Sequence, residues 1–260
     1  MARKNPKSPT RDPASLVDAS GALDLANQTY DENVFLFPAN IIGYCRIILA
    51  AVSLHYMSYH PKYCSITYVI SCLLDAVDGP VARARGESSK FGAVLDMVTD
   101  RCTTSCLLCY LSSAYPSYAV AFQFLIALDF SSHYMHMYSS IITGSTSHKN
   151  VDSQVSRILS FYYNDRRALF IICAVNELFF VALYLAKWWS TPIGFLSGPE
   201  IPWPLADWSW ASAVAVLSAP ICFLKNIINI VQLWKASKIL VGVDLNERKQ
   251  ARLAKQAKAQ

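Results

Sequence analysis

The sequence predicts an all-α, polytopic membrane protein with six transmembrane helices. The chain has 260 residues, of which 53% are hydrophobic and only 16% are charged. Its mean hydropathy is positive, at +0.27. Long apolar runs reach the length of about 20 residues that an α-helix needs to cross a bilayer. Together these observations indicate a helical membrane protein with one compact domain.

Six segments are long enough to span the membrane. They are expected, in order, near residues 41–58, 65–84, 91–114, 118–142, 168–189 and 210–233. The third segment carries Gly92, Asp96 and Asp100, so its first turns must face the protein interior and not lipid.

Polar segments flank the expected membrane domain, residues 31–240. Residues 1–30 contain three prolines and four basic residues, which indicates a disordered cytosolic extension with some tendency to bind a membrane surface. Residues 241–260 alternate charged residues with alanine, as a solvated helix does, and are expected to form a charged cytosolic tail.

The basic residues orient the predicted helices. Of 23 Lys and Arg, 18 fall in four stretches: before Asn40, in 83–90, in 143–168, and from Lys235 onward. The opposite loops, 56–64, 115–117 and 190–209, contain one basic residue, Lys62. By the positive-inside rule both termini face the cytosol, which agrees with an even number of spans.

Four aspartates, here called the aspartate cluster, stand out against this apolar background: Asp75, Asp78, Asp96 and Asp100. The run that holds them reads D-x2-D-G-x2-A-R-x8-G-x3-D-x3-D. Carboxylates are costly at membrane depth and usually mark an ion or substrate site. Spacings of three and four place each pair on one helix face. Two facing pairs predict an all-oxygen site for Mg²⁺ or Mn²⁺; the alternative is unrelated helix-end acids solvated at the interface.

This run matches, position for position, the signature of the CDP-alcohol phosphotransferase family, which the chain therefore resembles. The resemblance implies the family's fold and the transfer of a substituted phosphoryl group from a CDP-linked donor to an alcohol, with CMP leaving. It implies two Mg²⁺ or Mn²⁺ ions per site. Asp75, Asp78 and Asp96 would hold one ion, and Asp75, Asp96 and Asp100 the other. Asp100 also matches the general base that takes the acceptor's proton.

The other signature positions are candidate contacts of the CDP-linked donor, CDP-diacylglycerol: Gly79, Ala82, Arg83, Ser89 and Gly92. Small residues let a nucleotide approach the backbone, although they serve close helix packing equally well. Arg83 can donate to phosphate in a fork, and its alternative is an interfacial arginine that snorkels to the surface. Ser89 matches a donor-contacting position of the family; otherwise it is a loop residue.

Stretches outside the signature resemble the eukaryotic family members that use CDP-diacylglycerol as donor and myo-inositol as acceptor. These stretches are 31–37, 40–44, 91–97 with 99–102, 145–149, 168–170 and 176–179. The likeness runs from about residue 31 to 240. It implies a homodimer in the endoplasmic reticulum membrane, in contact with membrane lipids, and no nucleic-acid partner is expected.

A neutral, hydroxyl-rich acceptor needs paired hydrogen-bond donors and acceptors. Asp129, His133 and His136 fall at i, i+4 and i+7 and form one polar stripe on the fourth span. The alternative is a set of hydrogen bonds between helices. His148 and Lys149, in the following loop, are further candidates, with a solvated loop as their alternative.

Other assignments stay open at this level. Arg46, one turn inside the first span, is a candidate contact of the diphosphate. The acceptor can instead be glycerol phosphate or serine. A non-enzymatic divalent-cation carrier also uses intramembrane acids, but it needs a polar path to both surfaces. Here the acids gather toward one face and the opposite loops are nearly uncharged, which argues against a carrier.

Overall fold

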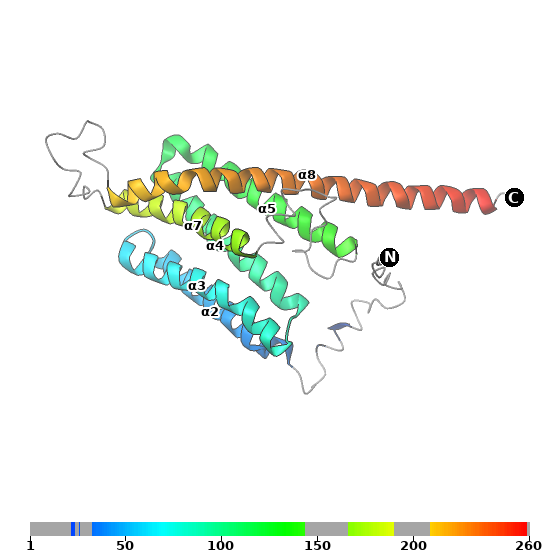
Figure 1. Cartoon of the computed structure of the whole chain (residues 1–260), viewed down its shortest axis with the longest axis horizontal. Helices are drawn as coiled ribbons and strands as arrows, with labels where there is room; N and C mark the ends of the chain where they lie inside the picture. Colours follow the sequence, from blue (N-terminus) through cyan, green and yellow to red (C-terminus); the bar gives the residue numbers. More distant parts are fainter. Residues whose placement is uncertain (1–21, 24–25, 27–32, 144–165, 190–208, 259–260) are drawn as a thin grey trace, which may run out of the picture.

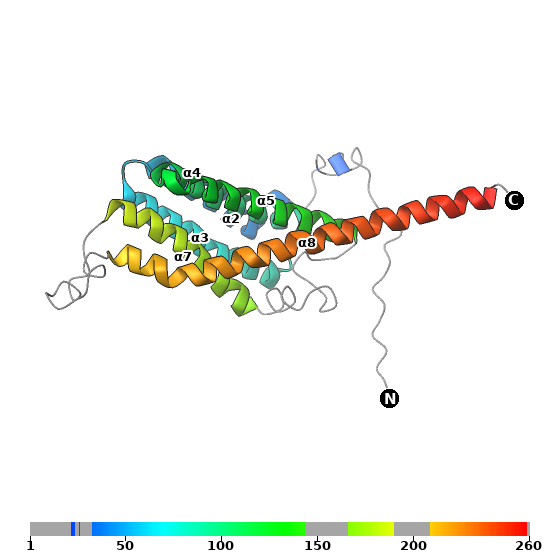
Figure 2. The ribbon, with the colours of Figure 1, turned by 90° about the horizontal axis from the view of Figure 1, so that it is seen from above.

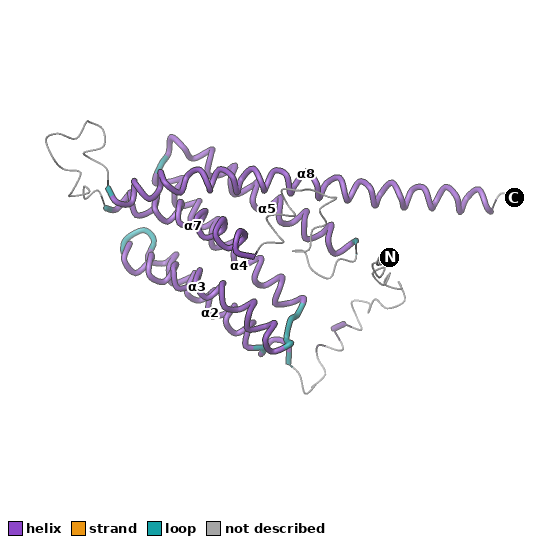
Figure 3. The backbone as a smooth tube through the Cα atoms, viewed as in Figure 1, coloured by secondary structure: helices purple, strands orange, loops and turns teal. Residues whose placement is uncertain are grey.

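The computed structural model describes residues 22–23, 26, 33–143, 166–189 and 209–258, which are mainly helical (Figures 1 and 3). The long helices are α2 (Pro38–Tyr56), α3 (Pro61–Arg85), α4 (Lys90–Ala114), α5 (Ala119–Ile142), α7 (Arg166–Trp188) and α8 (Trp210–Lys258). Two short 3-10 turns, η2 (Val34–Leu36) and η3 (Pro116–Tyr118), precede α2 and α5. Each predicted span corresponds to one long helix, which confirms the all-α fold class.

Local sequence explains where several helices begin. α2 and α3 carry proline in their first turn, where the missing N–H costs nothing. α4 begins after Ser89, whose side chain accepts a hydrogen bond from the Gly92 N–H. α3 ends at Gly86, whose φ of +69° is the left-handed conformation that glycine adopts without strain.

The helices form a ring around a shared interior. α2 packs along α3, and the two run side by side in Figure 1, while α7 and α5 both pack against α8. α4 contacts α2, α5 and α7, and α7 also contacts α3, which closes the ring. This arrangement brings α2, α4 and α8, which are far apart in the sequence, around the same bundle interior.

A hydrophobic core joins α3, α4, α5 and α7. Its most buried members are Tyr68, Leu107, Leu108, Leu111 and Tyr184. Many other large apolar side chains point outward, as expected for helices that face lipid and not water.

Among the described residues, four helices are long and apolar enough to cross a membrane, namely α2, α3, α7 and α8. α4 and α5 were also predicted as spans, and both form continuous helices of 25 and 24 residues. Polar side chains lower the hydropathy of both helices. Among them are Asp96 and Asp100 of α4 and Asp129 of α5, which face the bundle interior. The membrane character of the chain follows from the four apolar helices.

α8 differs from the prediction in its length. The expected span covered residues 210–233, but the helix continues without a break to Lys258 and projects beyond the bundle (Figure 2). At about 1.5 Å per residue its 49 residues cover roughly 74 Å, more than twice the bilayer core of about 30 Å. Residues 241–257 of this continuation are almost all exposed. The predicted extension 1–30 lies outside the described residues, apart from residues 22–23 and 26.

Candidate active site

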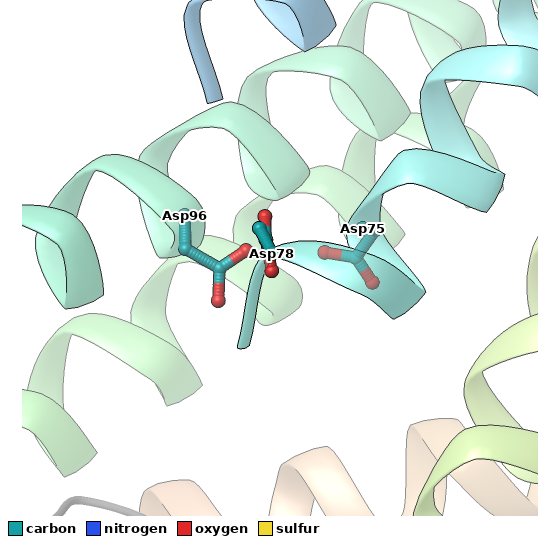
Figure 4. A group of neighbouring side chains, drawn as sticks. All are labelled: Asp75, Asp78 and Asp96. Carbon is teal, nitrogen blue, oxygen red and sulfur yellow. The ribbon is translucent and has the colours of Figure 1, made fainter. Parts of the chain in front are cut away.

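The aspartate cluster lies where α3 ends and α4 begins. Figure 4 shows the side chains of Asp75 and Asp78, from α3, and of Asp96, from α4, converging on one point. One oxygen from each of these three carboxylates lies within 4.8 Å of the others. The two helix faces therefore meet as the residue spacing predicts.

The turn between α3 and α4 brings these faces together. Gly86 reverses the chain after α3, and the N–H of Glu87 donates to the carbonyl of Ala82 at 2.9 Å. Three residues after Gly86, the Ser89 hydroxyl accepts from the Gly92 N–H at 2.9 Å and starts α4. The short connection makes both acid pairs enter the same end of the bundle.

Arg46 of α2 occupies the centre of the aspartate cluster. Its Nη1 donates to Asp78 Oδ2 at 2.9 Å and to Asp96 Oδ1 at 2.8 Å. Its Nη2 lies 2.9 Å from Asp75 Oδ1 and also contacts Asp100 Oδ1. The Arg46 side chain is 4% exposed, whereas the four carboxylates are 12–40% exposed. The cluster is thus open to ligands on one side and closed by a guanidinium on the other.

The donor set of the aspartate cluster fits a hard divalent cation. Its ligand atoms are carboxylate oxygens, which Mg²⁺ and Mn²⁺ prefer. Four carboxylates against Arg46 and Arg101, which lies 3.6 Å from Asp100, leave an excess of negative charge, and the cluster already surrounds the Arg46 guanidinium. Asp75, Asp78 and Asp96 form a three-residue ligand group. Asp100 reaches the same guanidinium, but its place in a second ion site stays a prediction.

The predicted donor contacts lie in the last two turns of α3 and at the start of α4. Arg83 folds back over Gly79, because a Cβ added at Gly79 would lie 3.2 Å from Arg83 Nη1. A Cβ added at Gly92 would lie 2.5 Å from Asn40 Oδ1. Helix packing therefore accounts for Gly92, and a nucleotide contact there stays a prediction. Ser89 caps α4, and Ala82 lies in the last turn of α3.

The predicted acceptor stripe lies on α5 inside the bundle. Asp129 is 6% exposed, and its Oδ1 accepts from Lys225 Nζ at 2.7 Å, Arg101 Nη1 at 3.1 Å and Asn229 Nδ2 at 3.1 Å. His133 Nε2 lies 3.1 Å from the same Arg101 nitrogen. His136 is also buried, with 9% exposure. Asp129 thus makes hydrogen bonds between helices, which was the alternative to an acceptor contact. The His133 side chain is 18% exposed, so a role in binding the acceptor stays a prediction for it. His148 and Lys149 lie outside the described residues.

Arg101 and Lys225 were not singled out from sequence, although both belong to this polar interior. Arg101 Nη2 lies 3.6 Å from Asp100 Oδ2, so it connects the aspartate cluster to Asp129. Lys225 is 6% exposed within the apolar first half of α8. Their positions within predicted spans could have identified them, because ionisable residues are rarely placed in a membrane helix without a partner.

Glu177 of α7 is a further buried carboxylate of the bundle interior, and it accepts hydrogen bonds from two other helices. Its carboxylate accepts from the Tyr68 hydroxyl of α3 and from the Thr104 hydroxyl of α4, each at 2.9 Å. Three helices of the ring therefore meet at this side chain.

Fold and site together define a helical membrane protein whose interior holds a cluster of four carboxylates suited to a divalent cation. The sequence profile of the CDP-alcohol phosphatidyltransferase family matches residues 36–196, which is more than half of the chain. The chain belongs to this family.

Individual relatives are more specific. Over 231 residues the chain is 48% identical to the CDP-diacylglycerol–inositol 3-phosphatidyltransferase of Schizosaccharomyces pombe, covering 87% of this chain and 98% of the relative. The proteins of the same name from Saccharomyces cerevisiae and Homo sapiens are 44% and 41% identical. The alignments cover 82% and 84% of this chain, and 90% and 97% of those relatives. No solved structure matches the chain.

Proposed function

We propose that this chain is a CDP-diacylglycerol–inositol 3-phosphatidyltransferase. It transfers the phosphatidyl group of CDP-diacylglycerol to a hydroxyl of myo-inositol and releases CMP. The observation that carries this proposal is the convergence of the aspartate cluster, in a chain whose full-length relatives bear that name.

The proposed chemistry relies on positioning and charge. Asp100 accepts the proton of the attacking hydroxyl, and close placement compensates for its weakness as a base. Arg83 donates to the diphosphate from the end of α3. When bound, two Mg²⁺ or Mn²⁺ ions would neutralise the phosphate oxygens and the leaving CMP. The ligands would be Asp75, Asp78 and Asp96 for one ion, and Asp75, Asp96 and Asp100 for the other.

The polar interior next to Asp100 suits a neutral acceptor. Among the described residues, the two cations closest to Asp129 both contact its carboxylate, Arg101 at 3.1 Å and Lys225 at 2.7 Å. A phosphorylated acceptor would require a cation that is not already paired with a carboxylate. A polyol requires directed hydrogen bonds, which His133 and the Arg101 guanidinium can make.

An acceptor panel tests the function. Purified protein in detergent receives CDP-diacylglycerol with Mn²⁺ or Mg²⁺, and CMP release is measured with myo-inositol, glycerol 3-phosphate, serine or no acceptor. We expect CMP and phosphatidylinositol only with inositol, and no release when EDTA replaces the metal. Release with another acceptor alone would place the chain elsewhere in the family. No release under any condition would contradict an enzymatic function.

We further propose an endoplasmic reticulum location, both termini in the cytosol, and a homodimer. The four basic stretches of the sequence support the orientation. Tags placed before Met1 and after Gln260 should both be digested by protease added to sealed microsomes. Protection of either tag would contradict this orientation.

A further inference from the structure

Arg46 is held by the whole aspartate cluster. Its two terminal nitrogens contact one oxygen of each of the four carboxylates. Arg101, the other guanidinium nearby, reaches only Asp100 among these four, at 3.6 Å. Among the described residues, Arg46 is therefore the one cation that all four acids share.

The position of Arg46 is set by its backbone, not only by these ion pairs. The Ser71 hydroxyl of α3 donates to the Arg46 carbonyl at 3.1 Å and fixes α2 against α3. The side chain itself is long, and its buried Nε has no hydrogen-bond partner among the described residues. The guanidinium thus has an unused donor and a flexible stem on a fixed helix.

The carboxylates that Arg46 binds are the carboxylates proposed as metal ligands. Asp75 Oδ1, Asp78 Oδ2 and Asp96 Oδ1 each lie within 2.9 Å of an Arg46 nitrogen. A divalent ion that binds these carboxylates must therefore compete with the Arg46 guanidinium for them. Without any cation, four carboxylates at the end of two helices would repel one another in a partly desolvated site.

We propose that Arg46 is the resident counter-cation of the aspartate cluster. It holds the four carboxylates together before metal loading and releases them when a divalent ion binds. Its freed fork then donates to the diphosphate of the donor lipid. This proposal rests on the proposed function, because that function supplies the metal and the diphosphate.

Thermal melting in two conditions tests the proposal. Wild type, Arg46→Met and Lys225→Met are melted in EDTA and in MnCl₂. Lys225→Met is the matched control, since it also removes a buried cation from a carboxylate, but from Asp129 and not from the cluster. In EDTA, Arg46→Met should melt at least about 6 °C below wild type, because a buried ionic network has lost its only shared cation. MnCl₂ should restore most of that loss, whereas the loss in Lys225→Met should be the same in both conditions. An Arg46→Met loss that Mn²⁺ does not reduce would overturn the proposal.

Metal affinity provides a second readout that does not require the methionine variant to fold. Mn²⁺ binding is measured by electron paramagnetic resonance for wild type and Arg46→Lys. Lysine keeps the charge but cannot reach four carboxylates with a planar fork, so it should compete less well. We expect Arg46→Lys to bind Mn²⁺ several-fold more tightly than wild type. Equal or weaker binding would overturn the exchange. If wild type binds no Mn²⁺ at all, the proposed function fails as well, and this outcome separates the two proposals.

Discussion

Replacing Gly92 with alanine should destabilise the protein, mainly through a clash with Asn40. A Cβ at this position would lie 2.5 Å from Asn40 Oδ1 and 3.0 Å from Ser89 Oγ. Asn40 cannot move freely, because it is 3% exposed and its Nδ2 donates to the Val34 carbonyl at 2.6 Å. The clash therefore separates α4 from the start of α2 or breaks the hydrogen bond that fixes η2.

The magnitude follows from three opposing effects. Overfilling a packed site costs about 1–3 kcal/mol, and loss of the Asn40–Val34 hydrogen bond about 0.5–1.5 kcal/mol. Removing a glycine from a helix returns about 1 kcal/mol. We expect a net loss of about 2 kcal/mol, which lowers the melting temperature by about 4–8 °C in a chain of this size.

The assay compares melting temperatures across a small set of variants. Gly242→Ala is the control, since nothing lies within 4 Å of its added Cβ, and it should be neutral or slightly stabilising. Asn40→Ala removes the clashing oxygen, so Gly92→Ala should cost much less in that background than in wild type. A Gly92→Ala protein as stable as wild type, or a cost unchanged by Asn40→Ala, would refute the packing explanation. CMP release by the double variant then shows whether a nucleotide also needs the bare backbone at Gly92.

Two further predictions concern the bundle interior. Glu177→Ala should lower the melting temperature by about 6 °C or more, because the Tyr68 and Thr104 hydroxyls lose their shared buried acceptor. Tyr68→Phe should cost less, since Thr104 still donates to Glu177; an equal loss in the two variants would show that Glu177 does not join the helices. His133→Ala should raise the KM for inositol about tenfold or more while the KM for CDP-diacylglycerol barely changes, as expected for loss of one hydrogen bond worth about 1–3 kcal/mol. If both constants shift equally, or neither does, the polar stripe on α5 serves helix packing.

Much of the fold could be predicted from the sequence, because apolar runs of membrane-spanning length have few other stable structures. Prolines begin α2 and α3 and Ser89 caps α4, but the predicted spans did not use these signals and start one to four residues later. The tail was expected to resemble a solvated helix, but its continuity with the last span was missed, since the hydropathy signal stops near residue 233 while helix-forming residues continue to Lys258. Hydropathy marks the edge of the membrane and not the end of a helix.

The aspartate cluster was predictable because its members are neighbours along two helices. The cationic partners of the buried acids were not. Arg46 lies 29 residues before Asp75 of the cluster, and Lys225 lies 96 residues after its partner Asp129 on α5, so only the packing of α2 and α8 brings these pairs together. The stripe on α5 was found from its spacing, but spacing could not show that Asp129 already has three donors.

The most direct test of the account measures metal-dependent transfer in four variants that keep side-chain shape: Asp75→Asn, Asp78→Asn, Asp96→Asn and Asp100→Asn. Purified proteins receive CDP-diacylglycerol, radiolabelled myo-inositol and saturating Mn²⁺ or Mg²⁺, and labelled phosphatidylinositol is counted. Wild type should form product only with metal. The Asp100→Asn variant should lose about 10²–10⁴-fold in rate, as expected for loss of a general base. The three other variants should lose activity through weakened metal binding. Full activity of wild type in EDTA, or an Asp100→Asn variant that keeps more than about a tenth of the wild-type rate, would contradict the central claim.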